Sequence, residues 1–193
     1  VLTRVGNSVW IGTNHGIAVI NPEVLSVNVL YQQQIPQAPV TDIIEHTPTN
    51  RVWVATRGAG IGYLNGDSTW GSIRTGAGLK SDTVFALAVS NAKIYAATQS
   101  GINEFDASLT TVTPSGAFDP LNTLSSTLSQ DVTFDQASNT LFVATTNGLA
   151  VRQNTSWSIF QRATGGLPID SGTDDVRAVG YDGTSLWMLL RRG

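Results

Sequence analysis

One short motif recurs along the chain and constrains its fold more than any other feature. The strings VWIGT, VWVAT, IYAAT and LFVAT each place an aromatic residue two positions before a small residue, and a threonine follows. A fifth string, LWMLL, carries one more aromatic residue. Successive aromatic residues are 43, 42, 47 and 45 positions apart. They are Trp10, Trp53, Tyr95, Phe142 and Trp187. A repeat of this length is one supersecondary unit that must pack on its neighbours.

The pattern around the motif predicts strands. Side chains two positions apart share one face of a strand, so each aromatic ring lies beside a small residue on one surface. A glycine then follows at Gly16, Gly60, Gly101 or Gly148, which is typical of a tight turn. Each period contains four short apolar segments and no helical pattern. These features predict an all-β chain, a β-propeller of four-stranded antiparallel blades.

The repeat divides the chain into four blades and part of a fifth, which we expect to be an arc of a larger propeller. The fourth strands are expected at SVNVLY, STWGSI, LTTVT and SWSIF, and the segments between blades are long and polar. The expected blades span residues 1–34, 40–75, 83–114, 128–162 and 174–193, and the last is incomplete.

Composition argues against several functional classes. The net charge is −3, and Lys80 and Lys93 are the only lysines, so there is no basic patch for a nucleic acid. Cysteine is absent, which removes disulfides and thiolate ligands. No apolar stretch reaches the roughly 20 residues of a membrane helix. We therefore expect no cofactor, no nucleic acid and no membrane insertion in this segment.

The sequence contains no convincing catalytic or metal-binding set. His15 and His46 lie in turns expected at opposite ends of the blades, where both should be exposed. Asp174 and Asp175 are adjacent, so their side chains point to opposite faces of an extended segment and are expected to be solvated. We expect Trp10, Trp53 and Trp187 in the core, which leaves the outer-strand residues Trp70 and Trp157 as candidates for stacking on a sugar.

One segment resembles a known repeat family. The string GLPIDSGTDDVRAVGYDGTSLWMLL, residues 166–190, is similar to the two-component regulator propeller repeat, and QQIPQAPVTDII and GLKSDTVFALAV are weaker copies of its beginning. The resemblance extends over essentially the whole chain. It implies a ligand-binding or protein-binding propeller, because such repeats commonly form periplasmic sensing domains of hybrid two-component receptors, often for carbohydrates. Similar repeats also occur in secreted and cell-envelope proteins.

The candidate binding site lies on the face that carries the turns between the second and third strands of each blade. These turns and the segments between blades meet at the same end of every blade, so each copy adds polar groups to one surface. Arg57 is the most informative residue there, because the other copies have neutral residues at its position. The expected ligand-binding or partner-binding residues are Asn14, His15, Arg57, Gln99 and Asn147.

The sequence favours a non-catalytic module that binds a small carbohydrate-like ligand or a protein partner. Such a sensor-like module would be extracytoplasmic, in the periplasm or outside the cell. A structural subunit of a secreted or cell-envelope assembly is the alternative. A propeller lyase or hydrolase is a second alternative, which would need a carboxylate, histidine or metal cluster around the central channel.

Overall fold

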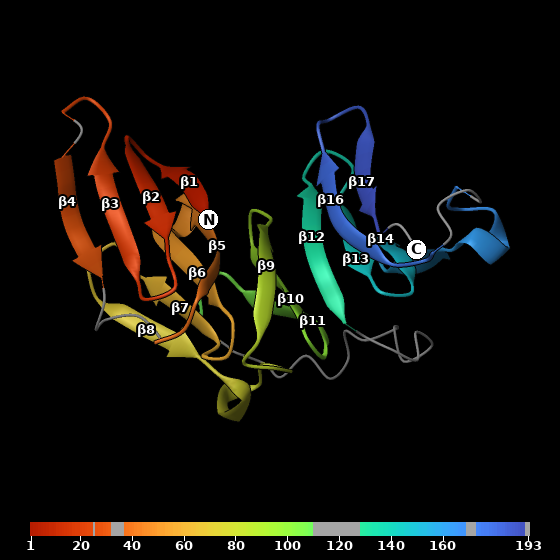
Figure 1. Ribbon diagram of the computed structural model, residues 1–193, viewed down its shortest axis with the longest axis horizontal. Coiled ribbons are helices and arrows are strands. Elements are labelled where there is room, and N and C mark those ends of the chain that lie inside the picture. The colour runs from red at the N-terminus through yellow and green to blue at the C-terminus, as the bar shows by residue number, and fades with distance from the viewer. Residues whose placement is uncertain (25, 32–36, 110–127, 169–172, 192–193) are drawn as a thin grey trace.

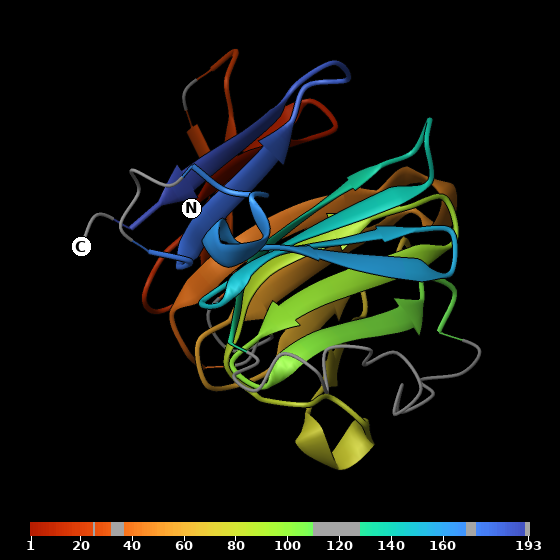
Figure 2. The same cartoon turned by 90° about the vertical axis from the view of Figure 1, so that its right-hand side faces the viewer.

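The computed structural model describes all residues except 25, 32–36, 110–127, 169–172 and 192–193. Its strands form five antiparallel sheets that follow one another along an open arc (Figure 1). Figure 2 shows the sheets stacked face against face. The molecule is therefore a β-propeller arc, and each sheet is a blade. No helix in the described part of the chain is long and apolar enough to cross a membrane.

Blades 1, 2 and 4 are four-stranded sheets with the strands in sequence order. Blade 1 consists of β1 (Leu2–Val5), β2 (Ser8–Gly12), β3 (Ile17–Asn21) and β4 (Ser26–Tyr31). Blade 2 consists of β5 (Val40–His46), β6 (Arg51–Thr56), β7 (Ile61–Leu64) and β8 (Trp70–Ile73). Blade 4 consists of β12 (Ser129–Asp135), β13 (Thr140–Thr145), β14 (Gly148–Gln153) and β15 (Ser156–Phe160).

The two other sheets contain fewer described strands. Blade 3 consists of β9 (Val84–Val89), β10 (Lys93–Thr98) and β11 (Gly101–Asp106), and its expected fourth strand, LTTVT, falls mostly outside the described residues. Blade 5 consists of β16 (Val176–Tyr181) and β17 (Leu186–Leu190). Short 3-10 helices span Thr47–Thr49, Thr75–Ala77 and Arg162–Thr164.

The five repeated aromatic residues occupy equivalent positions, as the sequence predicts. Each lies in the second strand of its blade, opposite the same position of the first strand. Their partners in the first strands are Thr3, Ile44, Ala88, Thr133 and Gly180. The register of the strands therefore repeats with the sequence.

The hydrophobic core lies between blades. Four clusters each join the aromatic face of one blade to the opposite face of the next. Trp10 is 6% exposed and Trp53 is 0% exposed, which confirms their predicted place in the core. The same prediction is wrong for Trp187, which is 66% exposed, because no described sheet covers the aromatic face of blade 5.

The two histidines lie at opposite ends of the blades, as expected, but their environments differ. His15 is exposed in the turn after β2. His46 is 1% exposed, so the expectation of an exposed turn residue is wrong. Its ring nitrogens contact Thr49 Oγ1 at 2.7 Å and the carbonyl of Ser90 in blade 3 at 3.0 Å. These two bonds satisfy the imidazole where blades 2 and 3 meet.

Candidate functional site

The recurring threonine fixes the turn between the second and third strands. In blade 2, Thr56 Oγ1 donates to the carbonyl of Gly60 at 2.7 Å and accepts from the amide of Ala59 at 3.2 Å. The threonines of blades 1, 3 and 4 donate to the turn glycine at 3.0, 2.7 and 2.8 Å. Each hydroxyl therefore bonds to a carbonyl and to an amide of its own turn. These bonds fix the conformation of the turn and the position of the residue that follows the threonine. Those next residues are Asn14, Arg57, Gln99 and Thr146.

A β-bulge recurs near the start of each innermost strand of blades 2 to 5. The register between the first two strands shifts there in every case. A bulge breaks the alternation of faces and re-aims one side chain. The bulged residues are Thr41, Phe85, Gln130 and Arg177. We did not predict these positions, although a signal exists: the apolar residues Val40 and Ile43 are three positions apart, where regular alternation requires two.

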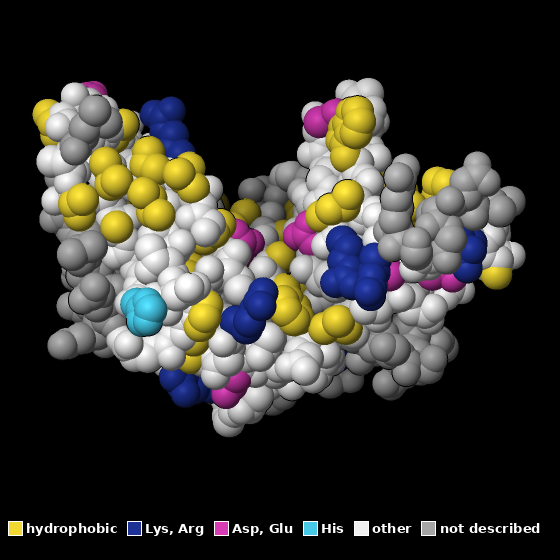
Figure 3. All heavy atoms as spheres, in the orientation of Figure 1, with side chains coloured by type: hydrophobic (Ala, Val, Ile, Leu, Met, Phe, Trp, Pro, Cys, Tyr) yellow, Lys and Arg dark blue, Asp and Glu magenta, His cyan; other side chains and the backbone are white. Residues whose placement is uncertain are grey.

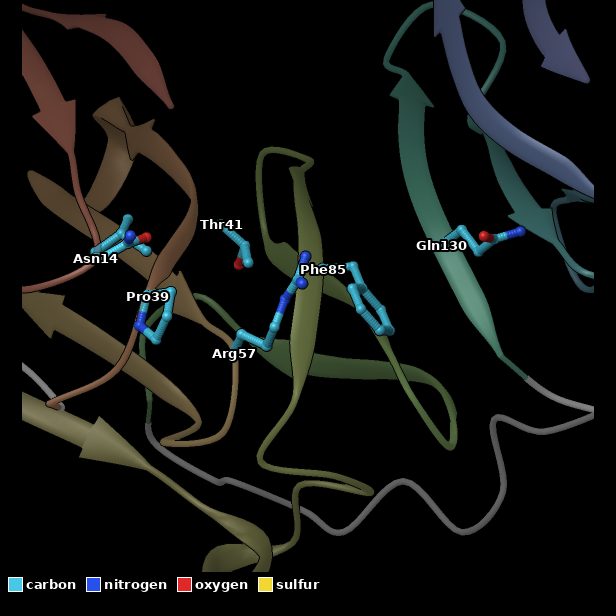
Figure 4. Close-up of a pocket in the computed structure, with 7 residues that line it drawn as sticks. Asn14, Pro39, Thr41, Arg57, Phe85 and Gln130 are labelled. Carbon is cyan, nitrogen blue, oxygen red and sulfur yellow. The ribbon is translucent and has the colours of Figure 1, made fainter. Parts of the chain in front are cut away.

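Three of the bulged residues line a cavity of about 510 Å³. It lies at the ends of the blades that carry the turns between the second and third strands. Figure 4 shows the lining side chains along successive blades, and Figure 3 shows the hollow between the two arms of the molecule. The cavity is lined by Asn14, Pro39, Val40, Thr41, Arg57, Phe85 and Gln130. Its volume lies within the range of about 300–1,000 Å³ that is usual for small-molecule sites.

The structure brings together two of the five predicted site residues. Asn14 and Arg57 both line the cavity. His15, Gln99 and Asn147 lie in the corresponding turns of blades 1, 3 and 4, but they are not among the lining residues. The carbonyl of Asn147 accepts a hydrogen bond from Gln161 Nε2 at 2.8 Å.

Arg57 is the basic residue of the cavity. Its guanidinium carbon lies 5.9 Å from the centroid of the Phe85 ring, within the range of a cation–π contact. Its backbone amide donates to the carbonyl of Pro39 at 2.9 Å, which fixes the start of the side chain. Among the described residues, no carboxylate lies within ion-pairing distance of the guanidinium. The charge is therefore available to a ligand.

Two aspartates stand next to the bulged residues and join successive blades. Asp42 accepts from the amides of Ile43 and of Leu87 in blade 3, both at 2.8 Å. Asp131 accepts from Val132 at 2.8 Å and from Val179 in blade 5 at 2.9 Å. Burial raises the pKa of both carboxyl groups above the usual value, although these amides oppose the shift. The charge of Asp131 also raises the pKa of Asp42.

The aspartates that precede the innermost strands have structural roles. Asp82 and Asp174 accept from the amides of Thr75 and Arg162 at 2.8 and 2.7 Å, so they cap equivalent 3-10 helices. Asp175 is buried, which corrects the expectation of a solvated pair. It accepts from Gln130 Nε2 at 2.5 Å and pairs with Arg177 at 2.8 Å. The described residues contain no group of three or more acidic, histidine or cysteine side chains that could hold a metal ion.

The outer-strand tryptophans are packed into the structure. Trp70 is half-buried against the cluster between blades 1 and 2, and Trp157 against the cluster between blades 3 and 4. The guanidinium of Arg152 lies 6.0 Å from the Trp157 ring centroid. Both rings therefore stabilise contacts between blades, in addition to any surface they offer to a sugar.

Comparison with solved structures supports the fold. The extracellular domain of the hybrid two component system BT3049 from B. thetaiotaomicron superposes with a TM-score of 0.76 at 20% identity, covering 97% of this chain and 26% of that one. The corresponding domain of BT4673 from the same organism gives 0.73 at 15% identity, covering 97% and 25%. PorZ, a surface component of the type-IX secretion system of Porphyromonas gingivalis, gives 0.68 at 14% identity, covering 98% and 25%.

These likenesses establish a β-propeller fold, and this chain spans about a quarter of the length of the structures it matches. No family model and no curated protein matches the sequence.

Proposed function

We propose that this chain is a non-catalytic recognition module that binds a ligand in the cavity at the rim of the arc. The observation that carries the proposal is Arg57, whose guanidinium stands at a cavity of about 510 Å³ without a carboxylate partner among the described residues. Five of the seven lining residues stand at turn or bulge positions that vary between blades, while the small residue, the threonine and the turn glycine around them recur. Variation on a repeated scaffold is how solenoids and propellers acquire binding specificity.

The side chains that line the cavity indicate the class of ligand that it would bind. Amide, hydroxyl and guanidinium groups beside a ring suit a small carbohydrate-like ligand or a short segment of a partner protein. The sensor-like role and the location in the periplasm or outside the cell are supported by the resemblance to two-component regulator propeller repeats. The fold shared with extracellular domains of hybrid two component systems supports them further.

The test compares two variants by binding to a glycan array and to a displayed peptide library. Asn14→Ala with Arg57→Ala removes two lining side chains, whereas Gln99→Ala changes the equivalent turn of blade 3 outside the cavity. We expect the double variant to lose binding at least about tenfold, since charged hydrogen bonds contribute about 1.5–3 kcal/mol. Gln99→Ala should bind normally. Unchanged binding by a folded double variant would place the site elsewhere, first on the outer strands near Trp70 and Trp157.

A structural subunit of a secreted or cell-envelope assembly is the second candidate, and the ends of the arc favour it. Leu2 is 69% exposed on blade 1, and Trp187 and Leu189 are 66% and 62% exposed on blade 5. Apolar exposure of this kind marks contact surfaces. If this role holds, Trp187→Lys should abolish assembly with the partner and leave array binding unchanged.

A further inference from the structure

Two of the side chains that line the cavity already make hydrogen bonds to the protein. These bonds determine whether such a side chain can still donate to a ligand or can only accept. Thr41 Oγ1 donates its proton to the carbonyl of Val84 in blade 3 at 2.7 Å. A hydroxyl has one proton, so Thr41 can offer only lone pairs to a ligand. This acceptor character is set by the scaffold and not by the ligand.

The bonds that Gln130 makes to the protein limit it in the same way to accepting hydrogen bonds from a ligand. Its Nε2 donates to the Asp175 carboxylate at 2.5 Å and to the carbonyl of Val176 at 2.8 Å. An amide nitrogen has two protons, so both are used and only Oε1 remains for a ligand. Figure 4 shows the amide nitrogen of Gln130 directed away from Arg57 and Phe85. Thr41 and Gln130, from blades 2 and 4, therefore present acceptors alone.

Arg57 has the opposite character. The guanidinium presents donors and a permanent positive charge, and the ring of Phe85 supports it at 5.9 Å. Asn14 carries both a donor and an acceptor in its amide and makes no side-chain hydrogen bond in the described part of the chain. A ligand therefore meets a cation at one place on the wall and acceptors at two others.

The aspartates limit how much negative charge a ligand can bring. Asp42 directly follows Thr41 in the chain and Asp131 directly follows Gln130, and the Asp175 carboxylate accepts from Gln130 Nε2 at 2.5 Å. A second anionic group placed near these acceptors would face repulsion and would find no basic partner among the lining residues.

We infer that the cavity binds a ligand with one carboxylate, which pairs with Arg57, and with hydroxyl or N–H donors that face Thr41 and Gln130. This inference rests on the proposed function and specifies its ligand. A uronic acid and the carboxyl terminus of a peptide share this chemistry. A densely sulfated saccharide does not fit, because it brings several anions, and neither does a neutral sugar, because it leaves Arg57 unpaired.

The experiment uses matched probes and ligand-observed NMR with the 193-residue chain. Glucuronate is compared with glucose, and a tripeptide with a free carboxyl terminus is compared with its amide. A trisulfated disaccharide is the polyanion probe. We expect one carboxylate probe to bind at least about tenfold more tightly than its neutral match, which is the size of effect that a charge-assisted pair supplies. The pair in which the difference appears identifies the source of the ligand.

Three variants test the residue assignments. Arg57→Gln removes the positive charge but leaves a polar side chain with an N–H donor, and it should remove the preference for the carboxylate probe. Thr41→Val removes an acceptor and should weaken the binding of both the carboxylate probe and its neutral match. Arg4→Gln is the matched control, because Arg4 is exposed at the other end of blade 1, and it should change nothing. A thermal melt of each variant confirms that it is folded.

Three outcomes overturn the inference: equal binding of neutral and carboxylate probes, tighter binding of the trisulfated disaccharide, or no carboxylate-dependent binding in either pair. The proposed function fails separately. If a neutral probe binds and Asn14→Ala with Arg57→Ala abolishes that binding, the cavity is a ligand site and only its charge preference is wrong.

Discussion

The side chain of Val40 fills the space that Gly12 leaves by having no side chain. A Cβ atom on Gly12 would lie 2.4 Å from Cγ1 of Val40, which is far inside van der Waals contact. Gly12 is the small residue of the repeated motif in blade 1, and Val40 begins the innermost strand of blade 2. The small residue therefore recurs because the next blade approaches closely at that point.

Enlarging this position should destabilise the arc. Ala97 and Ala144 are the equivalent residues of blades 3 and 4, and both are fully buried. We expect Ala97→Leu or Ala144→Leu to lower the free energy of unfolding by about 1–3 kcal/mol, because overpacking displaces the neighbouring sheet. Ala137→Leu makes the same change at an exposed turn residue and should have an effect within about 0.5 kcal/mol. Equal melting temperatures for the three variants would contradict close contact between blades.

Two glycines of the Arg57 turn separate the effect of close approach from that of backbone conformation. Gly60 has a φ of +79°, and a Cβ atom there would lie 2.3 Å from the carbonyl oxygen of Ile73. Gly58 has a φ of +111°, but nothing lies within 4 Å of its Cβ position. Both Gly→Ala changes introduce conformational strain of about 1 kcal/mol, whereas only Gly60→Ala adds a clash. Chemical denaturation should therefore rank Gly60→Ala as clearly the more damaging. The reverse order would exclude this explanation.

Arg152 links blades 3 and 4. Its guanidinium donates to Glu104 at 2.8 Å and to the hydroxyl of Tyr95 at 3.0 Å, and it stands 5.2 Å from the Tyr95 ring centroid. Arg152→Met should lower the free energy of unfolding by about 2 kcal/mol, because the half-buried Glu104 loses its nearest cation. Arg191→Met is the control, since Arg191 is exposed and 3.8 Å from Asp175. A loss no larger than that of the control would mean that solvent replaces this bond without penalty.

The pH dependence of stability should differ in sign between two groups of aspartates. The pKa of Asp42 is raised above 3.8 by burial, whereas hydrogen bonds from Trp187 and the turn amides lower the pKa of Asp182 below 3.8. A raised pKa means that the folded state takes up the proton first, so acidification through that pKa adds stability. A lowered pKa contributes stability above about pH 3.8 that is lost as the pH falls through the folded pKa.

The corresponding measurement is a set of thermal melts from neutral pH to about pH 3. Relative to Asp42→Asn, the unmodified protein should gain melting temperature as the pH falls from neutral to about 4. Relative to Asp182→Asn, any advantage of the unmodified protein should disappear below about pH 4. Parallel pH profiles for the protein and both variants would show that neither carboxyl group titrates as argued.

Much of the fold could be predicted because its strongest constraints are local and repeated. The aromatic residue, the small residue and the turn glycine all follow from strand periodicity and turn geometry, and the structure confirms their equivalence. The role of the threonine could not be predicted, since the bonds that Thr56 makes within its turn depend on the turn conformation. The burial of His46 depends on a carbonyl 44 positions away, on the next blade.

The candidate site was predicted less completely, for a physical reason. Arg57 and Asn14 were expected at the site and line the cavity, because the turn they occupy is a fixed part of the repeat. Phe85 and Gln130 were missed because a bulge aims them at the cavity, and strict alternation assigns such residues to a sheet face. The β-bulges interrupt the alternation of faces and place Phe85 and Gln130 at the cavity, and the alternating pattern alone does not predict this placement.

The ring of Trp187 should account for most of the tryptophan fluorescence that a solvent quencher can reach. Its equivalents Trp10 and Trp53 are 6% and 0% exposed because the next blade covers them, whereas Trp187 is 66% exposed. Its indole nitrogen donates to Asp182 at 2.9 Å, so the ring is held in place on the surface and does not fold into the core. Acrylamide should therefore quench Trp187 readily and Trp53 hardly at all.

Trp187→Phe should thus remove the larger part of the quenchable fluorescence, whereas Trp53→Phe should leave the quenchable part intact and lower the melting temperature. Trp70 and Trp157 are half-buried and should contribute the remainder. If Trp187→Phe leaves the quenching curve unchanged, another surface covers the aromatic face of blade 5 in solution. Light scattering would then show whether that surface belongs to a second copy of the chain, because the measured mass would be a multiple of 20.5 kDa.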